Sequence, residues 1–281
     1  MKQLRTMIAL LAILALALAA CGDDGTTEPT GAGSDTTEAG SDTTEGQPAA
    51  DFETVTEGTL TVCTDSPYPP MEFEVDGEFT GFDIELMREI AAGLGLDLAV
   101  NNTGFDPITS GLAMEAGDCD IAAASITITE ERAEAILFSD GYFTADQSLL
   151  VKADSGLTSL ADMDGQSLGV QTGTTGQIYA EENAPEGAEL VDFENPGDLF
   201  LALDGGQIAG ILQDIIPNAD RALSDDTVVV AETYPTDETY GFAAKLEGSE
   251  ALMDAVNTQL AALREDGTYD AIYDEFFPSA E

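Results

Sequence analysis

Three segments of the sequence that carry groups able to bind charged ligands follow runs of apolar residues. Arg132 follows one such run, a glycine- and threonine-rich turn covers 172–176, and Asp214 follows a third run. A guanidinium can hold a carboxylate through two hydrogen bonds, and the free N–H groups of such a turn, next to a helix start, can bind an anion. The carboxylate of Asp214 can accept hydrogen bonds from an ammonium group. Together the three groups complement the two charges of an α-amino acid.

Each group also has an ordinary structural explanation. Arg132 could pair with Glu130 or Glu134 at the surface, and the turn could be a tight turn that binds nothing. Asp214 could cap the helix expected over 215–222, in a chain where acids are abundant. The prediction of an amino-acid site therefore depends on the three signals occurring together.

Two aromatic residues and a further acid lie in loops close to these segments. Tyr68 stands between prolines after the first apolar run, and Phe105 precedes a helix that we expect to begin at Asp106. Aromatic faces can enclose the side chain of a ligand, and Asp65 can accept hydrogen bonds from it. These three residues are candidates for contacts with the side chain of an amino acid.

The segments that must position these groups alternate between strand and helix patterns. A 3.6-residue period predicts an amphipathic helix over 84–95, capped by Asp83, and Ile108 and Leu112 are expected to face the core from the next helix. Apolar runs predict strands at 60–64, 96–100 and 121–125. This order predicts a parallel sheet, and ligands bind such sheets at the carboxyl ends of the strands.

A second unit of the same kind follows. Strands are expected at 167–171, 189–193, 208–212, 228–232 and 240–245. Helices are expected at 176–183, 249–264 and 269–277, and a further helix is expected to begin at 195. Ser249 is the expected cap of the helix at 249–264. Two such units predict an α/β protein with two lobes, each a mostly parallel sheet flanked by helices.

The charge balance excludes several classes of function. The chain has 281 residues, with 55 aspartates and glutamates against 8 lysines and arginines, no histidine, and a formal net charge of −47. Without histidine there is no Ser-His-Asp or Cys-His nucleophile and no imidazole metal ligand. So few cations exclude nucleic acid as a partner, since binding phosphates requires Lys or Arg. We expect no catalytic residue, no metal and no cofactor, and our hypothesis is that the acidity is an adaptation of solvation, for example to salt.

The N-terminal segment is expected to lie outside the fold. Two basic residues precede an apolar run, 7–20, that is shorter than the roughly 20 residues needed to span a bilayer. Residues 1–20 match a secretory signal, and the small residues before Cys21 resemble a bacterial lipobox, so Cys21 is the expected lipidation site. Residues 21–56 carry nine acids and no lysine or arginine, which predicts a disordered acidic linker.

Short motifs lie in order along residues 60–277. They are Thr64-Asp65, Tyr68-Pro69-Pro70-Met71-Glu72-Phe73, Gly81-Phe82-Asp83-Ile84-Glu85-Leu86, Thr127-Ile128-Thr129-Glu130-Glu131-Arg132, Phe138-Ser139-Asp140, Gly173-Thr174-Thr175-Gly176, Asp214 and Tyr240-Gly241. With these motifs the sequence resembles family 3 of the extracytoplasmic solute-binding proteins, the receptors of polar amino-acid ABC importers.

The resemblance implies a two-lobed, periplasmic-binding-protein-like fold of type II. One lobe would comprise 57–144 plus 241–281 and the other 145–240, joined by a two-strand hinge. A ligand would enter the cleft, the lobes would close on it, and the closed form would dock on a membrane permease.

The resemblance also assigns ligand contacts. It places the carboxylate of an amino acid on Arg132, with Thr127 beside it and the main-chain N–H of Thr175 opposite. It places the ammonium group on Asp214 and on the carbonyl of Ser125, a position where the family often has glycine. The expected contacts are Asp65, Tyr68, Phe105, Ser125, Thr127, Arg132, Thr172, Thr175 and Asp214.

We expect a polar or basic amino acid as the ligand. No second cation lies in a pocket motif, so glutamate or aspartate would lack a partner, whereas a cationic or amide side chain could meet Asp65. Three alternatives stay open: binding of an amino-acid derivative such as ectoine or an opine, a ligand-sensing ectodomain, and a secreted dehydratase-like enzyme with Asp65 or Glu72 as general acid. The expected partners of a monomeric receptor are the permease of an ABC importer and, through Cys21, the outer face of the cell membrane.

Cys63 and Cys119 are the cysteines that remain after the lipidation site. They flank the first and third expected strands of one parallel unit, which are typically neighbours. In an oxidising exterior we expect them to form a disulfide, and the alternative is two buried thiols.

Overall fold

The computed structural model describes residues 52–277. The expected signal segment 1–20, the lipidation site Cys21 and most of the acidic linker therefore lie outside the described residues. The residues described belong to one compact unit. Within that part of the chain, none of the helices combines the length and apolar character that crossing a membrane requires.

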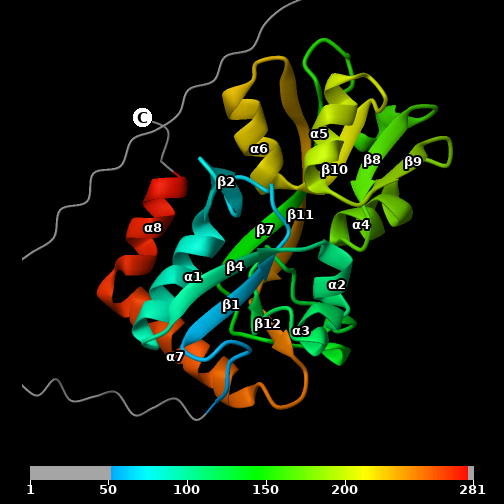
Figure 1. Ribbon diagram of the computed structural model, residues 1–281. Helices are drawn as coiled ribbons and strands as arrows, with labels where there is room; N and C mark the ends of the chain where they lie inside the picture. The colour runs from blue at the N-terminus through cyan, green and yellow to red at the C-terminus, as the bar shows by residue number, and fades with distance from the viewer. Residues whose placement is uncertain (1–51, 278–281) are drawn as a thin grey trace, which may run out of the picture. The chain divides into compact units, whose positions relative to one another are not determined.

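The first sheet has the strand order β4-β1-β5-β12-β6 (Figure 1). Its strands are β1 (Thr59–Thr64), β4 (Asp97–Asn102), β5 (Ile121–Ala122), β6 (Ile136–Phe138) and β12 (Ala243–Lys245). Strand β1 pairs in parallel with both β4 and β5, as the alternating pattern predicts, and β12 pairs antiparallel with β5 and β6. Strand β5 is shorter than the expected 121–125, because the chain turns at Ser125, whose φ is 50°.

Helices cover both faces of this sheet. Figure 1 shows α1 and α8 on one side and α2 and α3 on the other. The helices are α1 (Phe82–Gly93), α2 (Phe105–Thr109), α3 (Leu112–Ala116), α7 (Glu250–Asp266) and α8 (Thr268–Phe276), and a short hairpin, β2 (Phe73–Val75) and β3 (Glu78–Thr80), precedes α1. Apolar side chains of α1, α7 and α8 form one core with β1, and those of α2 and α3 form a second core on the opposite face.

Three expectations for this part of the chain are wrong in detail. Asp83 does not cap α1: Gly81 is the N-cap residue, and the Asp83 carboxylate is fully buried. Leu112 does not face the core, since 63% of it is exposed. Helix α7 begins after Ser249 as expected, but the Ser249 side chain makes no capping hydrogen bond.

The second sheet has the strand order β11-β7-β10-β8-β9. Its strands are β7 (Phe143–Lys152), β8 (Ser167–Gln171), β9 (Glu189–Phe193), β10 (Gly210–Asp214) and β11 (Val228–Tyr240). Strand β8 is parallel to β9 and β10, whereas β7 is antiparallel to β10 and β11. The expected strands 228–232 and 240–245 are wrong in their bounds, because β11 is one long strand with two register shifts and β12 is separate.

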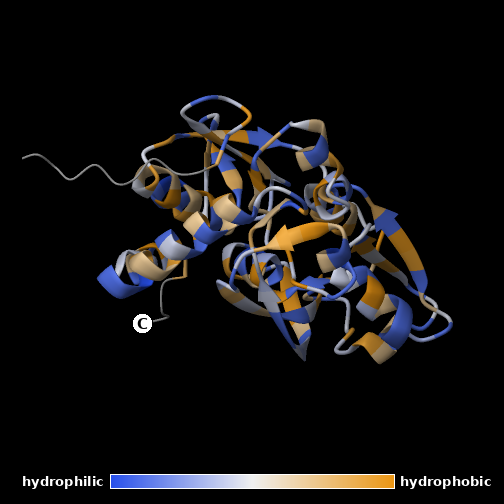
Figure 2. Cartoon of the chain, turned by 90° about the horizontal axis from the view of Figure 1, so that it is seen from below, coloured by the Kyte–Doolittle hydropathy of each residue, from blue (hydrophilic) through white to orange (hydrophobic). Residues whose placement is uncertain are grey.

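Helices also cover both faces of the second sheet. They are α4 (Thr175–Asn183), α5 (Pro196–Asp204) and α6 (Ile215–Ser224), with 3-10 turns η1 (Arg132–Glu134) and η2 (Leu160–Met163) elsewhere in the chain. Ala180 of α4 packs in the core on one face, and Leu199 of α5 packs in the core on the other. Figure 2 shows hydrophobic colour along parts of several strands and alternating colours along the helices, as expected for helices that cover a sheet.

Side-chain caps start two of these helices as their sequences indicate. Thr174 accepts a hydrogen bond from the main-chain N–H of Gln177 at 3.1 Å, and Asn195 accepts one from Gly197 at 2.8 Å with Pro196 in the first turn. Such caps satisfy N–H groups that have no partner within the helix. Helix α4 therefore begins at the end of β8.

The chain passes between the two sheets twice. Strands β7 and β11 run side by side there, with Phe143 paired to Tyr240. The ring of Phe143 stacks on that of Tyr240 with centroids 5.8 Å apart, and Tyr142 stacks on Phe242 at 4.1 Å. These aromatic contacts lie at the point where the family resemblance implies a hinge, and the lobe boundaries themselves stay a prediction.

Cys63 in β1 and Cys119 before β5 form a disulfide, with an S–S distance of 2.00 Å. Both cysteines are buried in the core that α2 and α3 share with the first sheet. The disulfide links β1 to the residue two positions before its parallel neighbour β5. Asp65 follows the end of β1, two residues after Cys63.

Candidate functional site

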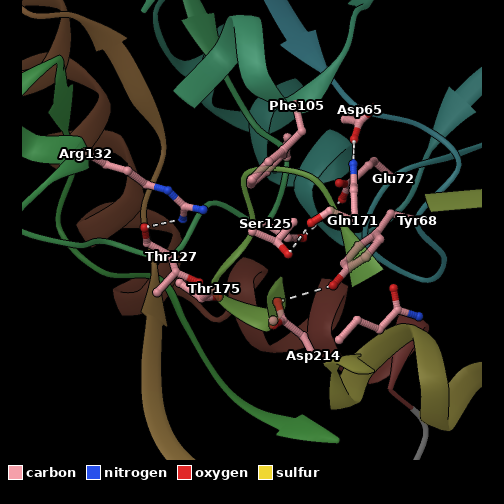
Figure 3. Close-up of a pocket in the computed structure, with 14 residues that line it drawn as sticks. Asp65, Tyr68, Glu72, Phe105, Ser125, Thr127, Arg132, Gln171, Thr175 and Asp214 are labelled. Carbon is pink, nitrogen blue, oxygen red and sulfur yellow. Dashed lines mark hydrogen bonds between the residues drawn. The ribbon is translucent and has the colours of Figure 1, made fainter. Parts of the chain in front are cut away.

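A narrow pocket lies between the carboxyl ends of strands from both sheets (Figure 3). Its free volume is about 30 Å³, which is enough for little more than a water molecule. Its lining comprises Asp65, Tyr68, Glu72, Phe105, Ala124, Ser125, Thr127, Arg132, Gln171, Thr174, Thr175, Gly176, Gln213 and Asp214. Eight of the nine expected contact residues are thus brought together.

Strand ends position the polar groups of this pocket. Asp65 directly follows β1, Gln171 is the last residue of β8, and Asp214 is the last residue of β10. Because ligand sites of parallel sheets form at the carboxyl ends of the strands, side chains that are far apart in sequence meet here. The nine-residue helix α4 begins next to Gln171, so Thr174 and Thr175 enter the lining as well.

Thr172 is the expected contact residue that lies outside the lining. Its hydroxyl donates a hydrogen bond to Glu194 at 3.3 Å on an exposed part of the surface. Alternate residues of an extended chain point to opposite sides, so Gln171, which precedes Thr172, faces the pocket in its place.

Arg132 is held in a fixed position from several sides. Its guanidinium donates hydrogen bonds to the carbonyl of Thr127 at 2.8 Å and to the carbonyl of Gly173 at 2.9 Å. The guanidinium carbon also lies 5.2 Å from the centroid of the Phe105 ring, a cation–π arrangement. These contacts leave further N–H donors of the guanidinium for a ligand, since the group has five.

The surroundings of Arg132 do not match a surface ion pair. The residue is only 8% exposed, and the ion pairs found among the described residues involve Arg88 and Arg221. Burial lowers the pKa of Arg132, and the nearby carboxylates of Asp214 and Glu238 oppose that shift. A buried guanidinium without a carboxylate partner in direct contact is suited to bind a carboxylate from outside.

Asp214 lies in a network of donors on the other side of the pocket. Its carboxylate accepts hydrogen bonds from the hydroxyls of Tyr68 and Tyr240 and from the side-chain amide of Gln147, and the Tyr68 distance is 3.2 Å. Burial raises the pKa of Asp214 to about 6, the charge of Glu238 adds to the rise, and the three donors oppose it. Asp214 makes no side-chain cap for α6, so the capping explanation fails.

Two further acids line the pocket beside Tyr68. The carboxylate of Asp65 accepts a hydrogen bond from the Gln171 amide at 2.6 Å, and burial raises its pKa to about 7. Glu72 is fully buried and accepts a hydrogen bond from the Ser125 hydroxyl at 3.2 Å. Burial raises the pKa of Glu72 well above its usual value, and the nearby charges of Asp83 and Asp65 raise it further.

Ser125 adopts a conformation that glycine favours. Its φ of 50° lies in the left-handed region, which costs a residue with a side chain roughly 1–2 kcal/mol. The main-chain N–H of Ser125 donates to Asp83 at 2.9 Å, and Asp83 also accepts a hydrogen bond from the Tyr142 hydroxyl at 2.7 Å. Asp83 therefore stabilises the turn at Ser125 from inside the protein, and burial raises its own pKa to about 7.

Sequence reasoning did not assign several residues to this site. Glu72, Gln171 and Gln213 line the pocket but were not among the expected contacts. From the sequence, Glu72 was named only as a possible general acid of the alternative enzyme and not as a ligand contact. The two glutamines stand at the ends of predicted strands, a position that also favours a ligand contact.

The part of the chain that the structure describes contains no cluster of three or more His, Cys, Asp or Glu side chains that could hold a metal ion. The lining offers groups that can recognise a ligand by hydrogen bonds and charge. One guanidinium faces three carboxylates, those of Asp65, Glu72 and Asp214, beside two aromatic rings.

Comparison with known proteins gives a consistent result. Residues 60–279 match the model of the family described as bacterial extracellular solute-binding proteins, family 3. The ABC transporter glutamine-binding protein GlnH of Bacillus subtilis (strain 168) is 36% identical over 201 residues, covering 70% of this chain and 72% of the relative.

Two solved structures are similar over most of the described residues. An ancestral arginine-binding protein bound to glutamine is 34% identical, with a TM-score of 0.72 and coverage of 79% of this chain and 99% of that chain. The ancestral amino acid-binding protein AncCDT-1, described as a precursor of cyclohexadienyl dehydratase, is 36% identical, with a TM-score of 0.72 and coverage of 78% and 96%.

Proposed function

The chain belongs to family 3 of the bacterial extracellular solute-binding proteins, and we propose that it is a receptor that binds an amino acid with a cationic or amide side chain. The amino acid would be delivered to the permease of an ABC importer. Relatives described as binding glutamine or arginine support this class of ligand.

The charge pattern of the pocket is the observation that carries the proposal. Arg132 is the one cation in the lining, and Asp65, Glu72 and Asp214 are three acids. Arg132 would bind the carboxylate of the amino acid, and Asp214 its ammonium group. Two acids are then left over for the ligand side chain.

The side chain would lie between Tyr68 and Phe105, with Asp65 and Glu72 as acceptors. Both residues are 8% exposed and line the pocket. A guanidinium or ammonium group would gain from the rings and from the carboxylates. A glutamate side chain would instead add a negative charge to a lining that already holds three acids.

Binding would require the pocket to open, since its free volume of about 30 Å³ is far smaller than an amino acid. We expect the two lobes, 57–144 plus 241–281 and 145–240, to move about the strands β7 and β11. The hydrogen bond between Asp65 and Gln171 joins groups that belong to strand ends of different sheets. Breaking that hydrogen bond would open the site. Contacts of the ligand with both lobes would then replace it and close the site again.

The family is extracytoplasmic. We further propose that lipid on Cys21 tethers the mature protein to the outer face of the cell membrane through the acidic segment 22–56. The sequence pattern around Cys21 supports this tether. Labelling of expressed cells with a fatty-acid probe would report lipidation, and Cys21→Ser should abolish the label.

A thermal-shift panel of the twenty amino acids with ectoine, opines and cystine tests the ligand class. We expect arginine, glutamine or histidine to raise the unfolding temperature most, with affinities then measured by isothermal titration. Tighter binding of glutamate than of these three would contradict the proposal.

One observation favours a second candidate, an enzyme that eliminates water from an amino-acid-like acid. Glu72 is buried with a raised pKa, as a general acid requires, and one similar structure is a precursor of a dehydratase. Mass spectrometry of ligand recovered after incubation separates the two functions, because a receptor returns its ligand chemically unchanged.

A further inference from the structure

Glu238 places a carboxylate between the two threonines that line the pocket near Arg132. One oxygen of this carboxylate, Oε2, accepts hydrogen bonds from the hydroxyl of Thr127 at 2.7 Å and from the hydroxyl of Thr175 at 2.6 Å. Figure 3 shows Thr127 and Thr175 next to each other on the Arg132 side of the pocket. Glu238 thus meets the residues at which the carboxylate of an amino acid is expected.

The hydrogen bonds to Glu238 use the only hydrogen that each threonine hydroxyl can donate. While Glu238 accepts these two hydrogen bonds, neither Thr127 nor Thr175 can donate a hydroxyl hydrogen bond to a ligand carboxylate. A ligand carboxylate would then depend on the guanidinium of Arg132 and on main-chain N–H groups, and it would approach a second negative charge.

Other contacts fix Glu238 in this place. Its second oxygen, Oε1, accepts hydrogen bonds from the Gln147 amide at 2.8 Å and from the Thr236 hydroxyl at 3.1 Å. Glu238 stands where β11 shifts its pairing register with β7, next to Asp237 at a φ of 50°. Each oxygen of the carboxylate thus accepts two hydrogen bonds. Glu238 itself lies in β11, one of the two strands at which the chain passes between the sheets.

We propose that Glu238 is a specificity residue that competes with the carboxylate of the ligand for the hydroxyls of Thr127 and Thr175. The competition weakens recognition of the ligand carboxylate, which then depends on Arg132 and on main-chain N–H groups, and it gives the ammonium group and the side chain a larger share in the choice of ligand. Because Thr127 follows β5 of the first sheet and Thr175 begins α4 beside the second sheet, Glu238 also joins the two parts of the site in the way a ligand carboxylate would.

The test compares an amino acid with its α-carboxamide, which keeps the ammonium group and side chain but lacks the negative charge. The probe pair is arginine and argininamide, or the corresponding pair for whichever amino acid gives the largest thermal shift. We expect Glu238→Gln to increase the preference for the acid over the amide by roughly tenfold, as one hydrogen bond to a charged group would provide. Glu238→Ala should change the preference in the same direction.

Asp237→Asn is the matched control. It removes the same charge from the neighbouring, exposed position, and asparagine tolerates the positive φ that Asp237 adopts. We expect it to leave the acid-to-amide preference unchanged. An equal change in Asp237→Asn would overturn the proposal, because it would show a general charge effect.

The inference rests on the proposed function, but the two can fail separately. If the native protein binds none of the twenty amino acids, the proposed function fails, and a folded Glu238→Gln protein that gains binding still supports the competition. The native protein could instead bind an amino acid as proposed. The competition is then refuted if folded Glu238→Gln and Glu238→Ala proteins prefer the amino acid over its α-carboxamide no more strongly than the native protein does. Absence of binding by all of these proteins refutes both.

Discussion

The guanidinium of Arg132 lies over the ring of Phe105, 5.2 Å from its centroid. The same guanidinium donates to the carbonyls of Thr127 and Gly173. A group that is already oriented when the ligand arrives loses little conformational freedom on binding. This orientation supports our proposal that Arg132 binds the carboxylate of the ligand.

Replacement of Arg132 is expected to abolish most of the affinity. Arg132→Met keeps much of the apolar bulk against Phe105 but removes a bidentate, charged partner, so the affinity for arginine or glutamine should fall by about a hundredfold or more. Isothermal titration measures the loss. Arg221→Met is the control, because Arg221 pairs with Asp204 and Asp225 away from the pocket; similar losses in both variants would contradict the assignment.

The affinity for a cationic ligand should depend on pH. The pKa values of Asp65 and Asp214 are raised to about 7 and about 6, so both carboxyls take up protons as the pH falls through this range. A cationic ligand favours the ionised forms and lowers both pKa values, so binding near neutral pH should release protons and weaken as the solution is acidified. Titration calorimetry in buffers of different ionisation enthalpy counts the protons. Proton uptake on binding would be the opposite of this expectation.

Glu72 should reduce the stability of the ligand-free protein. Its pKa is raised in the folded state, so the folded state disfavours the charged form, and this penalty grows as the pH rises from the unfolded pKa toward the folded one. Glu72→Gln removes the charge and should raise the free energy of unfolding at about pH 8 by at least about 1 kcal/mol, with a smaller gain at about pH 4.

Denaturant unfolding at the two pH values measures this effect of Glu72. Glu74→Gln, two residues further along on the exposed hairpin strand β2, is the matched control and should change little. A loss of stability in Glu72→Gln at the higher pH would show that the ionised carboxylate stabilises the fold instead.

The disulfide should contribute to stability and little to binding. Cys63 and Cys119 are 56 residues apart in sequence, and closing a loop of that length restricts the unfolded chain by roughly 4 kcal/mol at 25 °C. The double variant Cys63→Ala/Cys119→Ala should therefore unfold at a lower temperature and still bind ligand. The protein without substitutions can be unfolded in the absence of a reducing agent and treated with a thiol reagent. Reaction of both Cys63 and Cys119 would show that the disulfide does not form.

Salt should stabilise the protein. The chain carries a formal net charge of −47, and ions at high concentration screen repulsion between exposed charges. The unfolding temperature is therefore expected to rise as NaCl is increased from about 0.05 M to about 1 M. A fall over this range would count against our hypothesis that the acidity is a solvation adaptation.

Most of the fold could be predicted from the sequence because the signals are local. Apolar runs mark the strands, turns follow them, and the carboxyl ends of parallel strands meet at one edge of a sheet. That rule predicts that Asp65 and the segment leading to Arg132 lie at one edge of the first sheet, and that Asp214 lies at the corresponding edge of the second. The family resemblance, and not this rule, implied that the two edges face each other. The rule fails for Thr172, because a single step along the chain reverses the side to which a residue points.

Other errors concern residues whose partners are distant in sequence. Asp83 reads as a helix cap, but its carboxylate is bonded to Ser125 and Tyr142, 42 and 59 residues away. Glu238 is one acid among 55 aspartates and glutamates, and its partner Thr127 lies 111 residues away. No local pattern distinguishes such a residue, because its surroundings exist only after both sheets have formed.

All five strands of the second sheet lie within residues 143–240, and the two ends of this segment pair with each other. The flanking strands β6 and β12 also pair, with Phe138 beside Ala243. Recombination between related genes at these two neighbouring points would exchange one complete sheet and leave every strand of the other intact. Such an exchange would keep Arg132 and import a new Asp214 region, so the two halves of ligand recognition could evolve by shuffling as well as by point mutation.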